Sequence, residues 1–338
     1  MRWFCVSKTV NCGLNNFLYV IPFLHLGPLT IPTFGLMVAC AMLAAFFVLR
    51  ADLERRGLAT PREKTRPSTA RKSASAEAEL LIAIPCIVGL AGAKLYHLLE
   101  SPAEFFAHPL ALLISPFGFA WFGGLLAGFA AFVWVGRRQQ IPLLTLLDVG
   151  SPAAALGYGI GRIGCFLSGD GDYGIPTSLP WGMSFPNGLV PTTDRVHPTP
   201  IYELIAACAI AWWLWRIGAR QIAAARTKAF AQVRERGATP EELASLSSAR
   251  PTRHPSAFEM FMVAHRVQFL RNWRRPQDGS AFAAYLVLTG LARFLVEFIR
   301  INPRSFLGMS NAQTASVVSM IAGFALWLWL VKYLGRRT

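Results

Sequence analysis

Long apolar runs constrain the possible fold of this chain more than any other feature of its sequence. A helix rises about 1.5 Å per residue, so about 20 apolar residues cross the hydrocarbon core of a bilayer. Charged residues make up only 15% of the chain and fall mostly between the runs. We therefore expect an all-α, polytopic membrane protein with seven transmembrane helices. The expected spans are roughly residues 30–49, 79–98, 115–135, 142–165, 199–217, 279–300 and 312–331.

Basic residues are concentrated in alternate connections between these runs. Of the 33 Lys and Arg residues, 25 lie in 50–72, at Arg137 and Arg138, in 216–275 and near the C-terminus. Cytoplasmic connections of membrane proteins carry such an excess, so the pattern predicts an external N-terminus and a cytoplasmic C-terminus. The net charge of +15 then reflects topology and attraction to anionic membrane lipids. We expect no nucleic-acid partner.

Four segments follow from this topology. Residues 1–29 are expected to form an external, interfacial segment, because their apolar stretch is short and broken by Pro and Gly. Residues 30–217 hold the first five spans and an external loop, 166–198. Residues 277–338 hold the last two spans. Residues 218–276 are predicted to be a cytoplasmic helical insertion, either solvated or lying against the membrane or a partner.

A glycine-rich stretch, ALGYGIGRIGCFLSGDGDYG (residues 155–174), contains the pattern G-x-G-x-x-G. A dinucleotide site needs a strand before this pattern and a helix after it. Here an apolar, Ala-rich segment precedes it and a loop of Gly and Asp follows, which argues against a nucleotide fold. Small residues such as Gly161 and Gly164 favour close helix packing in lipid instead. They also allow the backbone to approach a bound headgroup.

Charged residues inside two of the expected spans are candidates for a functional site. Arg162 lies at the outer end of the fourth span, and Arg293, Glu297 and Arg300 are spaced i, i+4, i+7 in the sixth. That spacing predicts that the last three share one helix face. One alternative is a self-neutralising ion pair that tolerates burial. The other is an anion site, in which guanidinium groups bind a phosphate and Glu297 orients one of them.

Cysteine and aspartate residues near the glycine-rich stretch leave several alternatives open. The six cysteines show no metal-binding spacing. Asp170 and Asp172 offer two carboxylates for a cation, but no further ligands are obvious, so a solvated turn is the default interpretation. Cys165 is either a reactive nucleophile or a passive buried residue. We expect no metal and no cofactor.

Several motifs together resemble bacterial prolipoprotein diacylglyceryl transferases. GRIGCFLSGDGDYG followed by HPTPIYE is similar to the signature of that family, and most of the membrane core shares the resemblance. The segment 218–276 lies outside it. Further similar segments are GPLTIPTFGL, GLAGAKLYHLLE, FGGLLAG, LTGLARFLVEFIR and GMSNAQTASVVSMIAG.

This resemblance implies an enzyme of the bacterial cytoplasmic (inner) membrane. Such an enzyme moves the diacylglyceryl group of phosphatidylglycerol to the lipobox cysteine thiol of a prolipoprotein, forming a thioether and releasing glycerol phosphate. Arg162, Arg293 and Glu297 match positions of the family's motifs, so they are the expected catalytic residues. The expected substrate-binding residues are Gly123, Gly124, Gly161, Gly164, Cys165, Asp170, Gly174, His197, Tyr202, Glu203 and Arg300.

The chain departs from the family pattern at three positions. Phe122 stands where the family has a histidine, Cys165 replaces an asparagine, and Phe34 replaces a tyrosine. His97 is a candidate to replace the missing histidine as general base, or it is an ordinary interfacial histidine. An acceptor thiol near arginines is also partly ionised without a base. Two rival functions remain: a divergent relative with another lipid or acceptor, and a non-catalytic lipid-binding or transport protein.

Overall fold

The computed structural model describes residues 20–27, 29–56, 70–100, 102–115, 120–235, 278–306 and 308–334. Most of the expected external segment 1–29 lies outside these residues. So does the part of the expected cytoplasmic insertion that follows residue 235.

Within the described residues, six long helices are apolar and long enough to cross a membrane, which confirms an all-α, polytopic membrane protein. The expected third span corresponds to α5 (Trp121–Arg138), whose last turn carries two arginines and which is not one of these six. The number seven and the orientation of the termini therefore stay predictions. The six helices are α1 (Thr33–Arg56), α2 (Ala70–Glu100), α6 (Leu143–Ser168), α7 (Thr199–Glu235), α10 (Ser280–Val296) and α11 (Asn311–Leu334).

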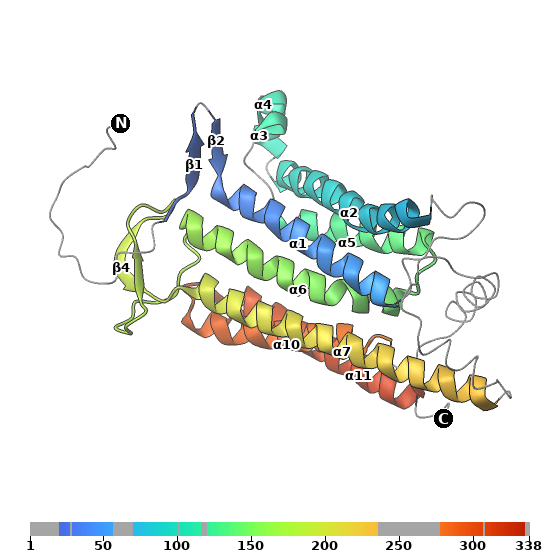
Figure 1. Ribbon diagram of the computed structural model, residues 1–338. Coiled ribbons are helices and arrows are strands. Elements are labelled where there is room, and N and C mark those ends of the chain that lie inside the picture. Colours follow the sequence, from blue (N-terminus) through green and yellow to red (C-terminus); the bar gives the residue numbers. More distant parts are fainter. Residues whose placement is uncertain are drawn as a thin grey trace, which may run out of the picture.

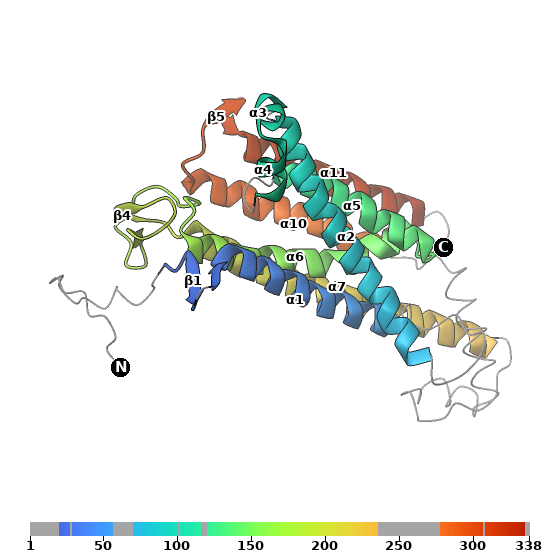
Figure 2. The same cartoon turned by 90° about the horizontal axis from the view of Figure 1, so that it is seen from above.

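These helices pack as a bundle in which most neighbours are antiparallel (Figures 1 and 2). Helix α6 lies in the middle, between α1 and α7, and α10 packs against both α6 and α7. Helix α11 pairs with α10, and α5 pairs with α2. One core cluster joins Leu49, Leu81 and Leu146, and a second joins Ala155 with Leu214. Helix α6 is thus the element against which the site can be built.

Several boundaries differ from those expected. Helix α1 begins at Thr33, because residues before it form an antiparallel hairpin of β1 (Phe23–Leu26) and β2 (Leu29–Pro32). Helix α7 continues to Glu235, well beyond the expected end of the fifth span. Two short helices, α3 (Pro102–Ala107) and α4 (Pro109–Ile114), follow α2. The remaining strands are β3 (Met183–Phe185), β4 (Thr192–Val196), β5 (Arg304–Phe306) and β6 (Met309–Ser310).

The loop between α6 and α7, residues 169–198, forms a small folded unit at one end of the bundle, which we call the loop end. Helix α6 stops there because Gly169 adopts a left-handed conformation (φ 60°), which closes the last turn. Strands β3 and β4 pair antiparallel within the loop. Tyr173 stacks on Phe185 with ring centroids 4.2 Å apart, and both are buried. The loop is thereby fixed against the helix ends.

A buried polar network lies at the opposite end of the bundle. The carboxylate of Asp148 in α6 accepts hydrogen bonds from the backbone N–H groups of Gly279 and Phe282, both at 2.8 Å. It therefore caps the first turn of α10, whose N–H groups have no partner within the helix. Gln221 of α7 also donates to Asp148, at 2.9 Å, and accepts from Arg56 of α1, at 3.0 Å. Four helices are joined in this way.

Candidate active site

The candidate site lies at the loop end, where α6 ends, α7 begins and α10 ends. Arg162 is in the last two turns of α6, and Glu203 is in the first two turns of α7. Arg293 is in the last turn of α10. Because α6 and α10 run toward the loop end and α7 runs away from it, residues far apart in the sequence meet at this level of the bundle (Figure 1).

Six charged side chains form one ion-pair network. We call it the arginine network; its members are Arg162, Arg293, Arg300, Asp172, Glu203 and Glu297. Glu203 is the common partner of all three arginines, with Arg162 Nε at 2.8 Å, Arg300 Nη1 at 3.5 Å and a close pair with Arg293. Arg293 also pairs with Glu297, at 3.1 Å. The sequence prediction that Arg162 and Arg293 share one site is consistent with this geometry.

The convergence of Arg293, Glu297 and Arg300 has a different origin from the one expected. The α-helix ends at Val296, and a 3-10 turn, η1 (Glu297–Ile299), follows. Arg300 has extended backbone angles and forms an isolated bridge with Gly174 of the loop. The prediction of a single helix face was therefore wrong for Arg300. Its side chain reaches the network from the loop side and pairs with Asp172.

The formal charges of the arginine network cancel, since it contains three guanidinium groups and three carboxylates. Glu203 and Glu297 have side chains only 2% and 1% exposed. Buried charges of this kind need partners, because desolvation is costly for each ion. Glu297 also accepts a hydrogen bond from Ser310 at 2.8 Å and one from Asn302. These bonds tie the end of α10 to the start of α11.

A cavity of about 690 Å³ opens onto the arginine network. Arg162, Glu203, Arg293 and Glu297 line it, so four predicted site residues share one hollow. Its other walls are mostly small and apolar residues of α6, α7, α10 and α11. This combination of an apolar cavity with a few converging charges is typical of a ligand site.

Tyr158 is a cavity residue that the sequence analysis missed. Its ring lies 4.8 Å from the guanidinium carbon of Arg162, within reach of a cation–π interaction. Tyr158 precedes Arg162 by one helical turn, and this i, i+4 spacing is a signal that could have identified it. Asn302 and Ser310 are two further polar lining residues that were not among the expected site residues.

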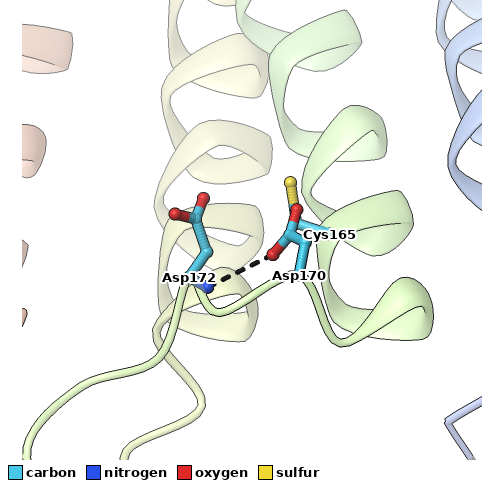
Figure 3. Close-up of side chains that lie close together, drawn as sticks. All are labelled: Cys165, Asp170 and Asp172. Carbon is cyan, nitrogen blue, oxygen red and sulfur yellow. Dashed lines mark hydrogen bonds between the residues drawn. The ribbon is translucent and has the colours of Figure 1, made fainter. Parts of the chain in front are cut away.

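Cys165, Asp170 and Asp172 lie close together beside the network (Figure 3). One ligand atom from each lies within 4.8 Å of the others, and the Asp172 N–H donates to Asp170 at 3.2 Å. Burial raises the pKa of Asp170. Burial alone would raise the pKa of Asp172 too, but Arg300 and Arg162 outweigh it and lower that pKa. The two guanidinium groups on Asp172 also oppose a bound cation, so the ion pairs explain this cluster better than a metal.

Cys165 is buried, and its Sγ lies 3.5 Å from Nη1 of Arg162. It does not line the cavity, and neither does Asp170. The three glycines of the signature that were expected to bind substrate have separate surroundings. Gly164 faces Phe34 and Met37 of α1, whereas Gly161 has no neighbour where a Cβ would lie. A Cβ on Gly174 would lie 2.7 Å from the carbonyl oxygen of Ile299, so this glycine lets the loop approach η1.

His197 and Tyr202 lie at the start of α7, next to the network but outside the cavity lining. His197 Nδ1 is 3.1 Å from the hydroxyl of Tyr202, which accepts a hydrogen bond from Trp181 of the loop at 2.8 Å. The Gly174 N–H donates to the His197 carbonyl at 2.9 Å. These contacts favour a role in holding the loop on α7.

The predicted residues on α2 and α5 do not meet the arginine network. Gly123 and Gly124 face α2, where a Cβ on Gly123 would lie 2.4 Å from the Gly92 carbonyl oxygen. They permit close packing of two helices and do not line the cavity. His97 of α2 is also absent from the lining. Phe122 does line the cavity, so the position that differs from the family pattern borders the site.

Comparison with known proteins identifies the family. The model of the family described as "Prolipoprotein diacylglyceryl transferase" matches residues 22–234 and 230–329. Proteins named phosphatidylglycerol–prolipoprotein diacylglyceryl transferase are similar to this chain. The one from Geobacter sulfurreducens is 34% identical over 185 residues, which cover 54% of this chain and 65% of the relative. The one from Synechococcus elongatus is 34% identical over 206 residues, 58% of this chain and again 65% of the relative.

The relative from Paracidovorax citrulli is 27% identical over 323 residues, which cover 90% of this chain and 93% of that protein. The family match includes the ends of α6 and α10 that carry the site. The chain therefore belongs to the prolipoprotein diacylglyceryl transferase family.

Proposed function

We propose that this protein transfers the diacylglyceryl group of phosphatidylglycerol to the lipobox cysteine of a prolipoprotein, in a bacterial cytoplasmic membrane. The observation that carries the proposal is the cavity in which Arg162 and Arg293 converge. A lipid headgroup supplies the phosphate that two guanidinium groups bind well, and the apolar walls suit its glycerol and acyl parts.

The reaction is a substitution at carbon. The sulfur of the acceptor thiolate attacks the glycerol carbon that carries the phosphate, and a carbon–sulfur bond forms as the carbon–oxygen bond breaks. The electron pair leaves on the phosphate oxygen of glycerol phosphate, and the thiol proton goes to solvent. No cofactor is needed, since nothing is oxidised or reduced.

Arg162 and Arg293 act on the leaving group in this scheme. Negative charge grows on the phosphate as the carbon–oxygen bond breaks, and fixed cations in an apolar cavity stabilise it strongly because little water screens them. Glu203 forms ion pairs with both guanidinium groups, and Glu297 forms one with Arg293. The carboxylates thus orient the cations before the lipid arrives.

A transfer assay with purified protein tests the proposal. Phosphatidylglycerol labelled in its acyl chains is incubated with a peptide that contains a lipobox cysteine. We expect a labelled peptide whose linkage resists hydroxylamine, as a thioether does, and one glycerol phosphate per peptide. A matched peptide with serine in place of the cysteine should stay unlabelled. Absence of product, while one of the similar transferases is active in the same assay, would refute the proposal and favour a lipid-binding or divergent role.

A further inference from the structure

The three carboxylates of the arginine network differ sharply in their surroundings. Glu203 and Glu297 lie at the ends of α7 and α10 with side chains 2% and 1% exposed. Asp172 lies on the α6–α7 loop, and its side chain is 30% exposed. It is also the carboxylate that pairs Arg162 with Arg300 across the loop side of the network. Asp172 is therefore the carboxylate of the network that can turn toward solvent.

Binding of a phosphate upsets the charge balance of this network. Three guanidinium groups and three carboxylates cancel, so a phosphodiester leaves one negative charge in excess, and glycerol phosphate leaves more. An uncompensated charge in a poorly hydrated site costs several kcal/mol. One carboxylate must then take a proton or withdraw. Protonation is disfavoured for Asp172, because Arg300 and Arg162 lower its pKa.

We propose that Asp172 is an exchangeable counter-ion that holds Arg162 and Arg300 before the lipid binds and gives up Arg162, which lines the cavity, to the phosphate of the substrate. The inference rests on the proposed function. When the lipid enters, the carboxylate turns toward solvent and Arg162 pairs with phosphate instead. When glycerol phosphate departs, Asp172 returns and competes with it, which speeds product release.

Backbone contacts allow this exchange to be confined to the side chain. The hydroxyl of Thr199 donates to the Asp172 carbonyl, and the Ile175 N–H donates to the carbonyl of Ile299 at 2.8 Å. The loop backbone is thus fixed to α7 and η1 on either side of the moving carboxylate. A rotation about the side-chain torsions is sufficient, since staggered alternatives are available to an aspartate at a partly exposed position.

The test compares Asp172→Asn with Asp194→Asn, an exposed aspartate of the same loop that is not part of the network. KM for phosphatidylglycerol, kcat and the inhibition constant for glycerol phosphate are measured in mixed micelles. Removal of one unit charge from a partly screened site changes anion affinity by about tenfold. For Asp172→Asn we expect KM and the inhibition constant each to fall about tenfold. Asp194→Asn should stay within about twofold of the wild type. Asp172→Glu keeps the negative charge, so its inhibition constant should not show the tenfold fall.

An unchanged KM, or a higher KM together with a lower kcat, would overturn the inference and assign Asp172 a purely structural role. Binding of inorganic phosphate, measured calorimetrically on the same three variants and the wild type, gives a readout that needs no turnover. If the wild type transfers no lipid, the proposed function fails, while tighter phosphate binding by Asp172→Asn still supports the exchange. Equal phosphate binding by Asp172→Asn and the wild type counts against it.

Discussion

Arg293 offers the sharpest test of how the site works, because one guanidinium group spans two carboxylates. One of its terminal nitrogens pairs with Glu203 and the other with Glu297, at 3.1 Å for the second. A lysine keeps the charge but has a single nitrogen, so it cannot bridge both partners. An alanine removes the charge as well. The variants Arg293→Lys and Arg293→Ala therefore separate geometry from charge.

The expected magnitudes follow from these contacts. Loss of one donor to a developing oxyanion typically lowers kcat by about 10²–10³-fold. We expect about 10³-fold for Arg293→Ala, and about 10–10²-fold for Arg293→Lys, since that variant retains a cation at the cavity wall. Breaking a buried ion pair costs about 3–5 kcal/mol of stability. The Arg293 side chain is 25% exposed, so we expect a value for Arg293→Ala near the lower end of that range.

The assay is transfer of labelled diacylglyceryl to the lipobox peptide, with thermal melting in detergent to follow stability. Arg304→Lys, at an exposed position beyond the network, is the matched control and should be fully active. The double variant Arg293→Ala with Glu297→Gln restores charge balance. It should melt closer to the wild type and remain inactive. If the double variant regains activity, or if Arg293→Ala keeps more than a tenth of it, Arg293 does not stabilise the leaving phosphate.

Three other predictions follow from the structure. Tyr158→Phe keeps the ring beside Arg162 and should retain most of kcat, whereas Tyr158→Leu should lose about tenfold; a large loss in Tyr158→Phe would show that the hydroxyl acts directly. Asp148→Ala leaves two backbone N–H groups of α10 unpaired and should destabilise the protein by about 3 kcal/mol or more in denaturant melts; equal stability would show that water replaces the cap. The rate of transfer should rise about tenfold per pH unit until it nears the pKa of the acceptor thiol, about 8.5; a plateau that begins below pH 7 would instead reveal a base in the protein.

The core of the site could be predicted from the sequence because its residues sit at the ends of apolar helices. A charged residue inside a long apolar run has few ways to avoid lipid, so Arg162 and Arg293 were expected to meet in a polar hollow. The six membrane helices follow from the same apolar pattern. Glu203 was predicted only from the family resemblance. Its ion pairs with three arginines could not be predicted from composition alone.

The side-chain orientations of the loop residues could not be predicted in this way. Asp170, and not Asp172, was among the expected substrate-binding residues. In the structure Asp172 pairs with two arginines, and Asp170 turns toward Cys165 instead. Which of two aspartates points inward depends on loop geometry, here on the left-handed Gly171 (φ 92°) between them. Side-chain direction in such a loop cannot be obtained from spacing.

Phe122 replaces the histidine of the family pattern, and this difference bears on how the acceptor thiol loses its proton. It borders the cavity, and among the described residues that line this cavity there is no histidine or lysine. The two lining carboxylates, Glu203 and Glu297, are already held by arginines, so taking a proton would break the ion pairs that orient the cations. The acceptor thiol must then reach the site already ionised, or lose its proton to water as it enters. In either case deprotonation depends on the pH of the solution, so the rate of transfer should follow the ionisation of the acceptor thiol.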